Sequence, residues 1–311
     1  MRLISFVIPC YRSEKTIQGV VDEIKQVMAT RDDEFEIILT NDASPDNTIG
    51  KIREIVDTND NVTGIDMAKN FGQHAGLMAG MRESKGDIVV FLDDDGQTPA
   101  NEVYKLIDKM DEGFDVVYAS YPTKKHSAFR NFGSKVNKKM TEALLDKPKN
   151  LYISSYFAAS RFVVGEMMKY SNPYPYVIGL VLRTTKNITN VEVNHREREV
   201  GESGYTLSKL VSLWINGFTA FSVKPLRIAT YTGVLVAILG LLYAVYAIIN
   251  KIVNPAAPLG WTSMIIILLV LGGMILAVLG LIGEYIGRIY ISLNNSPQYV
   301  IREKITKNNR K

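Results

Sequence analysis

Two long apolar runs near the C-terminal end constrain the fold of this chain more than any other feature. Residues 228–249 and 261–283 contain no charged side chain, although charged residues are frequent before and after them. Each run would make about 33 Å of helix, enough to cross a hydrocarbon core of about 30 Å. We therefore expect two membrane-spanning helices within residues 227–284. Two buried helices of a large soluble core are the alternative.

Basic residues flank both runs and predict the orientation of this hairpin. Lys224 and Arg227 precede the first run, whereas Arg288 and a basic tail ending at Lys311 follow the second. Because cytoplasmic flanks of spanning helices are enriched in Lys and Arg, we expect both termini in the cytoplasm. The protein is then a multi-pass protein of the plasma (inner) membrane, with a cytosolic domain in residues 1–226 and a solvated cytosolic tail in 285–311.

The cytosolic domain has the sequence pattern of an α/β fold. Short apolar runs alternate with segments of helical period, which is typical of a doubly wound, mostly parallel sheet with its ligand at the carboxyl ends of the strands. The expected strands are residues 3–8, 36–40, 62–66, 87–92 and 115–119, and the expected helices are 14–28, 46–56, 73–84 and 100–110. No dinucleotide fingerprint and no P-loop follows a strand, so neither motif supports a dehydrogenase or an ATPase.

Two further segments have amphipathic helical patterns. Residues 127–145 carry Phe129 and Phe132 on one face and basic residues on the others, and residues 205–221 carry Trp214 close to the first apolar run. Such helices lie in a membrane interface. Packing against the sheet, with the charges in water, is the alternative for both.

Cysteine content and net charge narrow the compartment and the partners. Cys10 is the single cysteine and cannot form an internal disulfide, in agreement with a reducing compartment; we expect a small buried residue at the end of a strand. The net charge of +4 favours anionic ligands such as nucleotide phosphates. It is too diffuse to indicate nucleic acid.

Three adjacent aspartates, Asp93, Asp94 and Asp95, follow the most apolar expected strand. Adjacent carboxylates repel one another unless a cation lies among them. Since alternate side chains of an extended segment point the same way, we expect Asp93, Asp95 and Gln97 to converge on Mg²⁺ or Mn²⁺ while Asp94 points elsewhere. An acidic, solvated turn is the alternative.

Six motifs follow one another along the chain: residues 7–11 (VIPCY) with Glu14, 41–46 (NDASPD), 70–74 (NFGQH), 93–99 (DDDGQTP), 196–203 (REREVGES) and 283–290 (GEYIGRIY). Residues 41–46 alone also fit a simple helix N-cap. In their order and spacing, however, the motifs together resemble family 2 glycosyltransferases of the GT-A fold. Within that family, the chain resembles the polyprenyl-phosphate branch that includes dolichol-phosphate mannose synthase, bactoprenol glucosyltransferases and the undecaprenyl-phosphate aminoarabinose transferase.

This resemblance implies a role for each motif. The nucleotide sugar, a UDP-sugar, is expected to contact Pro9, Tyr11, Glu14, Asp42, Asp93 and Asp94. The metal is expected on Asp95 with Gln97 and Asp93, and phosphates of donor or acceptor on Arg130, Ser134, Arg196, Arg198 and Ser203. The expected catalytic set is Asp93, Asp95, Arg130, Arg196 and Arg198. We expect His74 and His195, which lie beside these motifs, to be neutral packing residues.

The resemblance also has two departures. Gly204 stands where many relatives have Lys, and Ser155 lies near a position where relatives often have an acid. A polyprenyl phosphate is already ionised at neutral pH, so it needs no catalytic base.

We therefore expect inverting sugar transfer to undecaprenyl or dolichyl phosphate, for modification of cell-envelope glycans, by a homo-oligomer such as a tetramer. Transfer to a lipid hydroxyl, and a non-catalytic nucleotide-sugar sensor at the membrane, are the alternatives.

Overall fold

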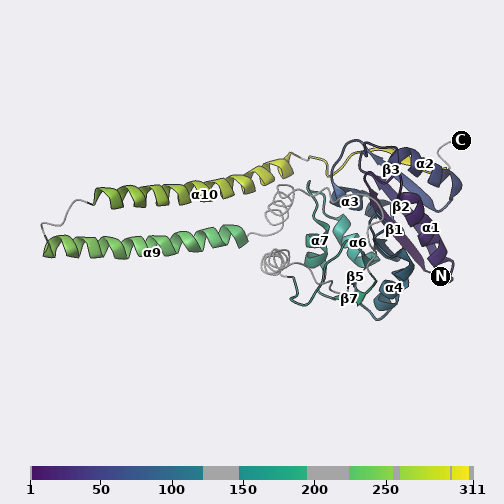
Figure 1. Cartoon of the computed structure of the whole chain (residues 1–311), viewed down its shortest axis with the longest axis horizontal. Helices are drawn as coiled ribbons and strands as arrows, with labels where there is room; N and C mark the ends of the chain where they lie inside the picture. The colour runs from purple at the N-terminus through teal and green to yellow at the C-terminus, as the bar shows by residue number, and fades with distance from the viewer. Residues whose placement is uncertain (1, 122–146, 195–223, 255–259, 295, 308–311) are drawn as a thin grey trace. The chain divides into compact units, whose positions relative to one another are not determined.

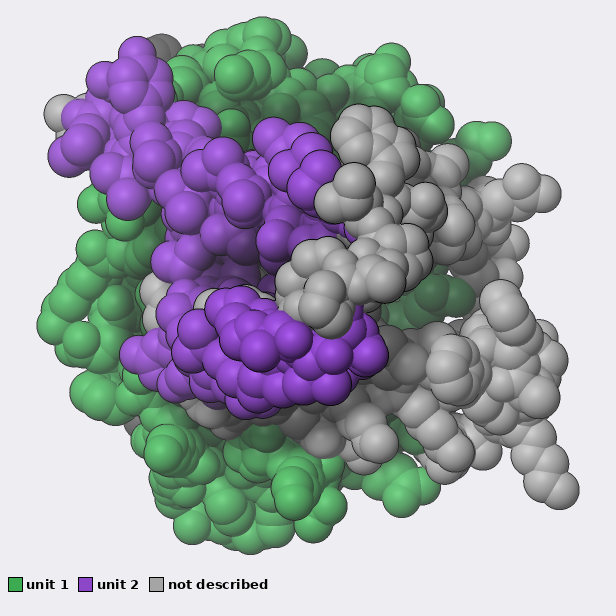
Figure 2. All heavy atoms as spheres, turned by 90° about the vertical axis from the view of Figure 1, so that its left-hand side faces the viewer, with its two compact units in different colours: residues 1–210, 295–311 green, residues 211–294 purple. Residues whose placement is uncertain are grey.

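The chain folds into two compact units. The structure, a computed structural model, describes residues 2–121, 147–194, 224–254, 260–294 and 296–307 (Figure 1). One unit contains residues 1–210 and 295–311, and the other contains residues 211–294 (Figure 2). The C-terminal residues therefore belong to the same unit as the N-terminal domain, although the two apolar helices lie between them in the sequence.

The first unit is built on one mixed sheet. Its eight strands among the described residues have the order β7-β5-β6-β4-β1-β2-β3-β8. The strands are β1 (Leu3–Cys10), β2 (Glu34–Asn41), β3 (Val62–Met67), β4 (Ile88–Phe91), β5 (Val116–Ser120), β6 (Phe157–Ser160), β7 (Ile188–Glu192) and β8 (Ile301–Ile305). The central strand β1 pairs in parallel with β2 and β4, whereas β6 and β8 pair antiparallel to their neighbours.

Helices cover both faces of this sheet. They are α1 (Ile17–Met28), α2 (Thr48–Thr58), α3 (Gln73–Glu83), α4 (Val103–Asp111), α6 (Arg161–Met168) and α7 (Val177–Thr184), with a short 3-10 turn η1 (Ala100–Glu102). Ile4, Phe6 and Ile8 of β1 share a core with α1, α2 and α4. Since strand side chains alternate, Val7 faces the opposite side, where α3 packs.

A glycine brings α3 unusually close to the sheet. A Cβ atom at Gly80 would lie 2.4 Å from Cγ1 of Val7, a separation that real side chains do not tolerate. The close approach fixes α3 against β1 and β2. Its first residue, Gln73, is thereby held at the carboxyl edge of the sheet, which is where the resemblance places the ligand.

The expected alternation of strands and helices is confirmed. The five expected strands appear as β1 to β5 and the four expected helices as α1 to α4, with ends that differ by a few residues. The sequence pattern did not reveal β6 or β7. Both are short, and Phe157–Ser160 lacks the β-branched residues that favour a strand.

The expected solvated tail is instead partly a strand. Residues Ile301–Ile305 form β8, which pairs antiparallel with β3. Ile305 is 2% exposed and packs over Gly64, where the missing side chain leaves room for it. A strand of five residues with charges at three positions gives too weak a sequence signal to be recognised.

The second unit is a helical hairpin. Helices α9 (Lys224–Val253) and α10 (Trp261–Leu293) run antiparallel and contact each other (Figure 1). The segments Leu226–Asn250 and Val270–Leu293 are long and apolar enough to span a membrane, and none of their most apolar window is buried. Apolar surface of this extent is stable in lipid and not in water. Helix α10 continues ten residues past Gly283, the end of the expected span.

Candidate active site

A pocket of about 490 Å³ lies at the carboxyl edge of the sheet, between loops that follow four parallel strands. Each strand end with its loop contributes one to three residues, and one more comes from the segment before β6. The lining consists of Pro9 and Cys10 at the end of β1, Tyr11 after it, Asp42 after β2, Asn70, Gly72 and Gln73 after β3, Asp93, Asp94 and Asp95 after β4, and Ser155. Of the expected nucleotide residues, only Glu14 is outside this lining.

Asp42 fastens the loop after β3 to the end of β2. Its two carboxylate oxygens accept hydrogen bonds from the backbone amides of Phe71, at 2.7 Å, and Gly72, at 2.8 Å. The Asn70 side chain adds a bond to the Asp42 carbonyl at 3.2 Å. Burial raises the pKa of Asp42, while the two amides act in the opposite direction. Asp42 therefore shapes the pocket wall from which Asn70 and Gln73 project.

Asp94 connects the loop after β1 to the loop after β4 by hydrogen bonds. Its carboxylate accepts hydrogen bonds from the Tyr11 amide at 2.9 Å and from the Ser13 hydroxyl. Arg12, between them, has a φ of 61°, in the left-handed region that non-glycine residues rarely adopt. The Asp94 carboxylate therefore stabilises the turn at Tyr11–Ser13 in addition to lining the pocket. Asp94 lines the same pocket as Asp93 and Asp95, so the expectation that it points away from its two neighbours stays a prediction.

Asp93 is held between two uncharged side chains. Gln73 donates from Nε2 to one carboxylate oxygen at 2.9 Å, and the Ser155 hydroxyl donates to the other. Burial raises the pKa of Asp93 to about 6, and the charges of Asp95 and Asp94 act in the same direction. The carboxylate is therefore in an environment that favours a cation beside it.

Asp95 completes the acidic set. One of its oxygens accepts a hydrogen bond from the backbone amide of Gln97 at 3.1 Å. The residue between them, Gly96, has a φ of 74°, which favours glycine. Gln97 itself is not among the lining residues. Within the described ranges no group of three or more His, Cys, Asp or Glu side chains could hold a metal ion. Mg²⁺ and Mn²⁺ fit this edge nevertheless, because they bind through one or two carboxylates and fill their other positions with phosphate and water.

Of the other expected nucleotide contacts, Tyr11 lines the pocket and Glu14 does not. Tyr11 is 46% exposed, and the guanidinium of Arg12 lies 5.7 Å from its ring centre. Glu14 instead joins two loops: its carboxylate accepts from the Asn47 amide at 3.3 Å, and its own amide donates to Asp46 at 3.4 Å. A nucleotide contact of Glu14 stays a prediction.

Two expectations about packing residues agree with the structure. Cys10 is fully buried at the end of β1. Burial lowers the pKa of His74 to about 4, so the ring is neutral at pH 7, and it packs edge-on against Tyr176 with 5.2 Å between ring centres.

Sequence reasoning missed three of the lining residues that contact the acidic set. Asn70 and Gln73 belong to a motif that carried the resemblance but received no role, and Ser155 was noted only as a departure. Five expected residues, Arg130, Ser134, Arg196, Arg198 and Ser203, lie outside the described residues, as do Gly204 and both amphipathic segments.

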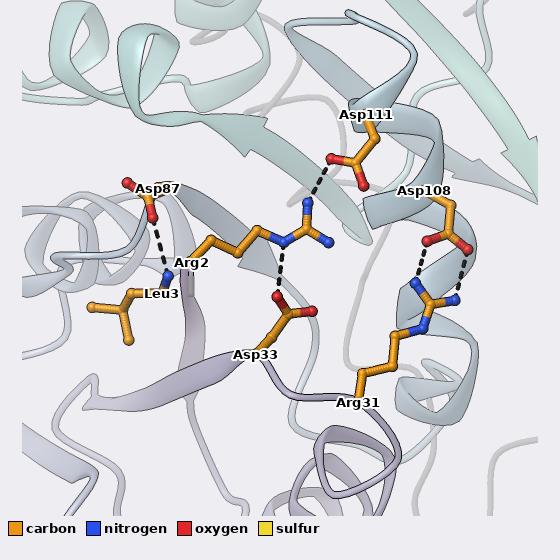
Figure 3. A network of polar contacts seen from close by, with 7 residues as sticks. All are labelled: Arg2, Leu3, Arg31, Asp33, Asp87, Asp108 and Asp111. Atoms are coloured by element: carbon orange, nitrogen blue, oxygen red, sulfur yellow. Dashed lines mark hydrogen bonds and ion pairs between the residues drawn. The ribbon is translucent and has the colours of Figure 1, made fainter.

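At the opposite, amino edge of the same sheet, several aspartates form ion pairs with arginines. Arg2 donates to Asp33 at 3.0 Å and to Asp111 at 2.5 Å, and Arg31 donates to both oxygens of Asp108 (Figure 3). The guanidinium beside it lowers the pKa of Asp108. These carboxylates have cationic partners within the protein, whereas in the described part of the pocket no Lys or Arg forms an ion pair with Asp42, Asp93 or Asp94.

Comparison with known proteins agrees with this geometry. The family described as "Glycosyl transferase family 2" matches residues 5–167, which include every lining residue, and the "GtrB C-terminal hairpin" matches residues 224–289. An uncharacterized glycosyltransferase, YkcC of Bacillus subtilis, is 33% identical over 96% of this chain and 93% of its own. The undecaprenyl-phosphate 4-deoxy-4-formamido-L-arabinose transferase of Proteus mirabilis is 31% identical over 97% and 94%.

Solved structures give the same fold. Glucosyl-3-phosphoglycerate synthase of Mycobacterium tuberculosis, in complex with Mn²⁺, UDP-glucose and phosphoglyceric acid, superposes with a TM-score of 0.53. The match covers 71% of this chain and 78% of that one, at 22% identity. The expected GT-A type of sheet is thus confirmed. On the strength of the match over more than half of its length and of the relatives that align end to end, this chain belongs to glycosyl transferase family 2.

Proposed function

We propose that the protein transfers a sugar from a nucleotide donor to the phosphate of a polyprenyl lipid, with inversion at the anomeric carbon. The observation that carries the proposal is that one chain joins an acidic pocket in a glycosyltransferase domain to a hairpin of membrane-spanning length. A lipid acceptor accounts for the hairpin. The Proteus mirabilis relative is by name a transferase for undecaprenyl phosphate.

The donor is a nucleotide sugar, and we propose a UDP-sugar. Pro9, Tyr11 and Asp42 line the pocket and would receive the base and ribose, because the half-exposed Tyr11 ring offers a face on which a base can stack. Asp93 and Asp94, which also line the pocket, are further proposed contacts of the nucleotide. The solved neighbour binds UDP-glucose and Mn²⁺, which supports this class of donor.

The metal we propose is Mg²⁺ or Mn²⁺, held by Asp95 and Asp93, with Gln97 as a further candidate ligand. When bound, such an ion stabilises the negative charge that develops on the departing diphosphate. The protein residues hold its carboxylate ligands in place: Gln73 and Ser155 fix Asp93, and the Gln97 amide fixes Asp95.

The acceptor supplies its own nucleophile. A lipid monophosphate has a second pKa near 6, so at neutral pH it carries an oxygen that needs no deprotonation. That oxygen forms a bond to the anomeric carbon while the bond to the nucleoside diphosphate breaks and its electron pair leaves with the diphosphate. No proton changes hands. This fits a pocket in which Asp42 and Asp94 already accept backbone hydrogen bonds and Ser155 stands near a position where relatives often have an acid.

Two anions must approach each other in this reaction, so cations are required. We propose that Arg130, Arg196 and Arg198, with Ser134 and Ser203, bind the acceptor phosphate and the diphosphate. A guanidinium offers paired donors to phosphate oxygens, which suits this task.

We propose that residues 1–226 form the catalytic domain on the cytoplasmic side of the plasma membrane. Strand β8, which follows α10, pairs with β3 in the first unit, so the chain returns to the domain from which α9 departs. Two spanning helices bring the chain back to the side of the membrane on which the first one begins, as this pairing requires. The basic residues on both flanks favour the cytoplasmic side. We further propose a homo-oligomer, such as a tetramer, which light scattering of the purified protein tests.

Purified protein tests the proposal when it is incubated with Mg²⁺ or Mn²⁺, a panel of UDP-sugars, and a short polyprenyl phosphate, its dephosphorylated alcohol or diacylglycerol. We expect one sugar to appear on the polyprenyl phosphate, identified by the mass of the glycolipid. Transfer to an alcohol and not to the phosphate would contradict the proposal. Donor binding without transfer to any acceptor would instead favour a nucleotide-sugar sensor.

A further inference from the structure

One loop of the catalytic unit is built unlike a solvent-exposed loop. In the segment between α6 and α7, Tyr174 lies between Pro173 and Pro175, has a φ of 57° and is 61% exposed. Left-handed backbone is costly for an aromatic residue, and exposure of the ring adds to the cost. Among the described residues, no hydrogen bond or ring contact holds this ring. The strained conformation therefore brings no visible gain inside the protein.

The loop is nevertheless firmly attached at its base. The Tyr170 hydroxyl donates to the Pro173 carbonyl at 3.5 Å. Gln298, which is 8% exposed, donates from its side chain to the carbonyls of Asn172, at 3.1 Å, and Tyr170, at 3.5 Å. Tyr174 is thus presented outward from a fixed base.

The segment that holds the loop comes directly from the hairpin. The candidate span in α10 ends at Leu293, and Gln298 follows five residues later. Five residues reach about 17 Å when fully extended. Whatever the arrangement of the two units, the base of the loop is within this chain length of the end of the span. The same segment exposes Val300 (42%) and Ile301 (37%).

The loop also contacts the helix that contributes to the pocket. Tyr176 packs edge-on against His74 of α3, and the preceding residue, Gln73, lines the pocket. The loop thus contacts both α3 and the segment that follows the hairpin. A lipid-borne acceptor would have to reach the pocket from the bilayer.

We propose that the Tyr174 loop is a membrane-contact surface that rests in the headgroup region of the bilayer. Tyrosine is enriched at this depth because its ring is apolar and its hydroxyl is polar. Contact with lipid removes the ring from water. The contact holds α3, which contributes Gln73 to the pocket lining, close to the lipid headgroups. The proposal rests on the membrane location proposed above.

Fluorescence quenching in lipid nanodiscs tests this surface. A fluorophore is attached to a cysteine introduced by Ser171→Cys, which leaves Tyr174 in place, and the nanodiscs contain lipid with a nitroxide in the headgroup region. Asp32→Cys, exposed at the opposite edge of the sheet, is the solvent control, and Leu241→Cys in α9 is the control for insertion. For the mid-span position 241 the nitroxide is placed midway along the acyl chain instead. The native Cys10 is fully buried, and unsubstituted protein measures any label on it.

We expect quenching at position 171 to exceed that at position 32 several-fold, and Tyr174→Asp to reduce it while Tyr174→Trp preserves it. Equal quenching at positions 171 and 32, with strong quenching at position 241, would overturn the membrane-contact surface alone. Absence of quenching at position 241 would overturn the membrane location and this proposal with it. As a second readout, Tyr174→Asp is expected to reduce turnover of polyprenyl phosphate in nanodiscs several-fold and to leave donor binding unchanged.

Discussion

Three aspartates of the pocket, at the carboxyl edge of the catalytic sheet, and three aspartates at its amino edge have partners of different kinds. At the amino edge, Asp33, Asp108 and Asp111 are ion-paired with Arg2 and Arg31 (Figure 3). At the carboxyl edge, Asp42, Asp93 and Asp94 are held by backbone amides, hydroxyls and one side-chain amide, none of which carries charge.

The difference in partners indicates that the aspartates of the amino edge stabilise the fold, whereas those of the carboxyl edge are available to a ligand. At the amino edge, the guanidinium of Arg31 lowers the pKa of Asp108, so this carboxylate keeps its charge without a bound ligand. At the carboxyl edge, burial and the neighbouring carboxylates raise the pKa of Asp93 to about 6, so the charged form is disfavoured until a cation arrives. Uncharged donors fix the geometry of these carboxylates and leave their charge to be neutralised by a ligand.

The largest effect is expected from removing a carboxylate at each edge in turn. Asp95→Ala should lower turnover about 100-fold or more, since loss of one group that stabilises developing charge has this magnitude. Asp111→Ala, its counterpart at the amino edge, should leave turnover nearly unchanged. Sugar transfer at equal amounts of folded protein is the measurement. Similar losses in both variants would show that the two edges do not differ in function.

Removal of the metal should affect the function of the carboxyl edge and leave the stability provided by the amino edge unchanged. We expect chelation to abolish transfer and added Mg²⁺ or Mn²⁺ to restore it, because burial and the neighbouring carboxylates disfavour the charged form of Asp93 unless a cation lies beside it. The thermal midpoint of unfolding without nucleotide should be unaffected by the chelator, since the ion pairs of the amino edge need no metal. Full transfer activity in chelator would remove the metal from the account.

A smaller effect is expected from Asp42→Asn. The amide retains one acceptor where the carboxylate served the amides of both Phe71 and Gly72, and an unsatisfied buried donor costs about 1–3 kcal/mol. The loop that carries Gln73 should loosen, which raises the KM for the donor about tenfold for 1.4 kcal/mol. The substitution Asp33→Asn at the amino edge is the matched control. A KM that rises equally in both variants would contradict the assignment of Asp42 to the pocket wall.

The smallest effect is expected at the amino edge itself. Arg2→Ala breaks ion pairs with Asp33 and Asp111 that are partly exposed, and such pairs contribute about 1 kcal/mol or less. The thermal midpoint should fall by about 2–4 °C for 1 kcal/mol in a domain of this size, and the difference from the unsubstituted protein should shrink in high salt. Kinetic constants should stay unchanged. A raised KM for the donor would extend the functional region to this edge.

Much of this contrast could be predicted from the sequence. The acidic cluster follows an apolar run, and the alternation of strands and helices places the end of that run at the ligand-binding edge. The two apolar runs are equally local features, because length and absence of charge suffice to recognise them.

The partners of the aspartates could not be predicted, because they depend on which strands become neighbours. Asp94 meets Ser13 and Tyr11 only since β4 lies beside β1, and Asp93 meets Ser155 only since β6 enters the sheet next to β4. No local pattern encodes that order. The pairing of β8 with β3 was hidden for the same reason, since more than 230 residues separate Ala68 from Arg302, whose side chain bonds its carbonyl.

Calorimetric titration of uridine diphosphate into the purified protein tests most directly that the carboxyl edge holds a cation together with a diphosphate. The account predicts clear binding with Mn²⁺, strong weakening in chelator, and the same weakening in Asp95→Ala with Mn²⁺ present. Binding of equal strength under all three conditions would contradict it.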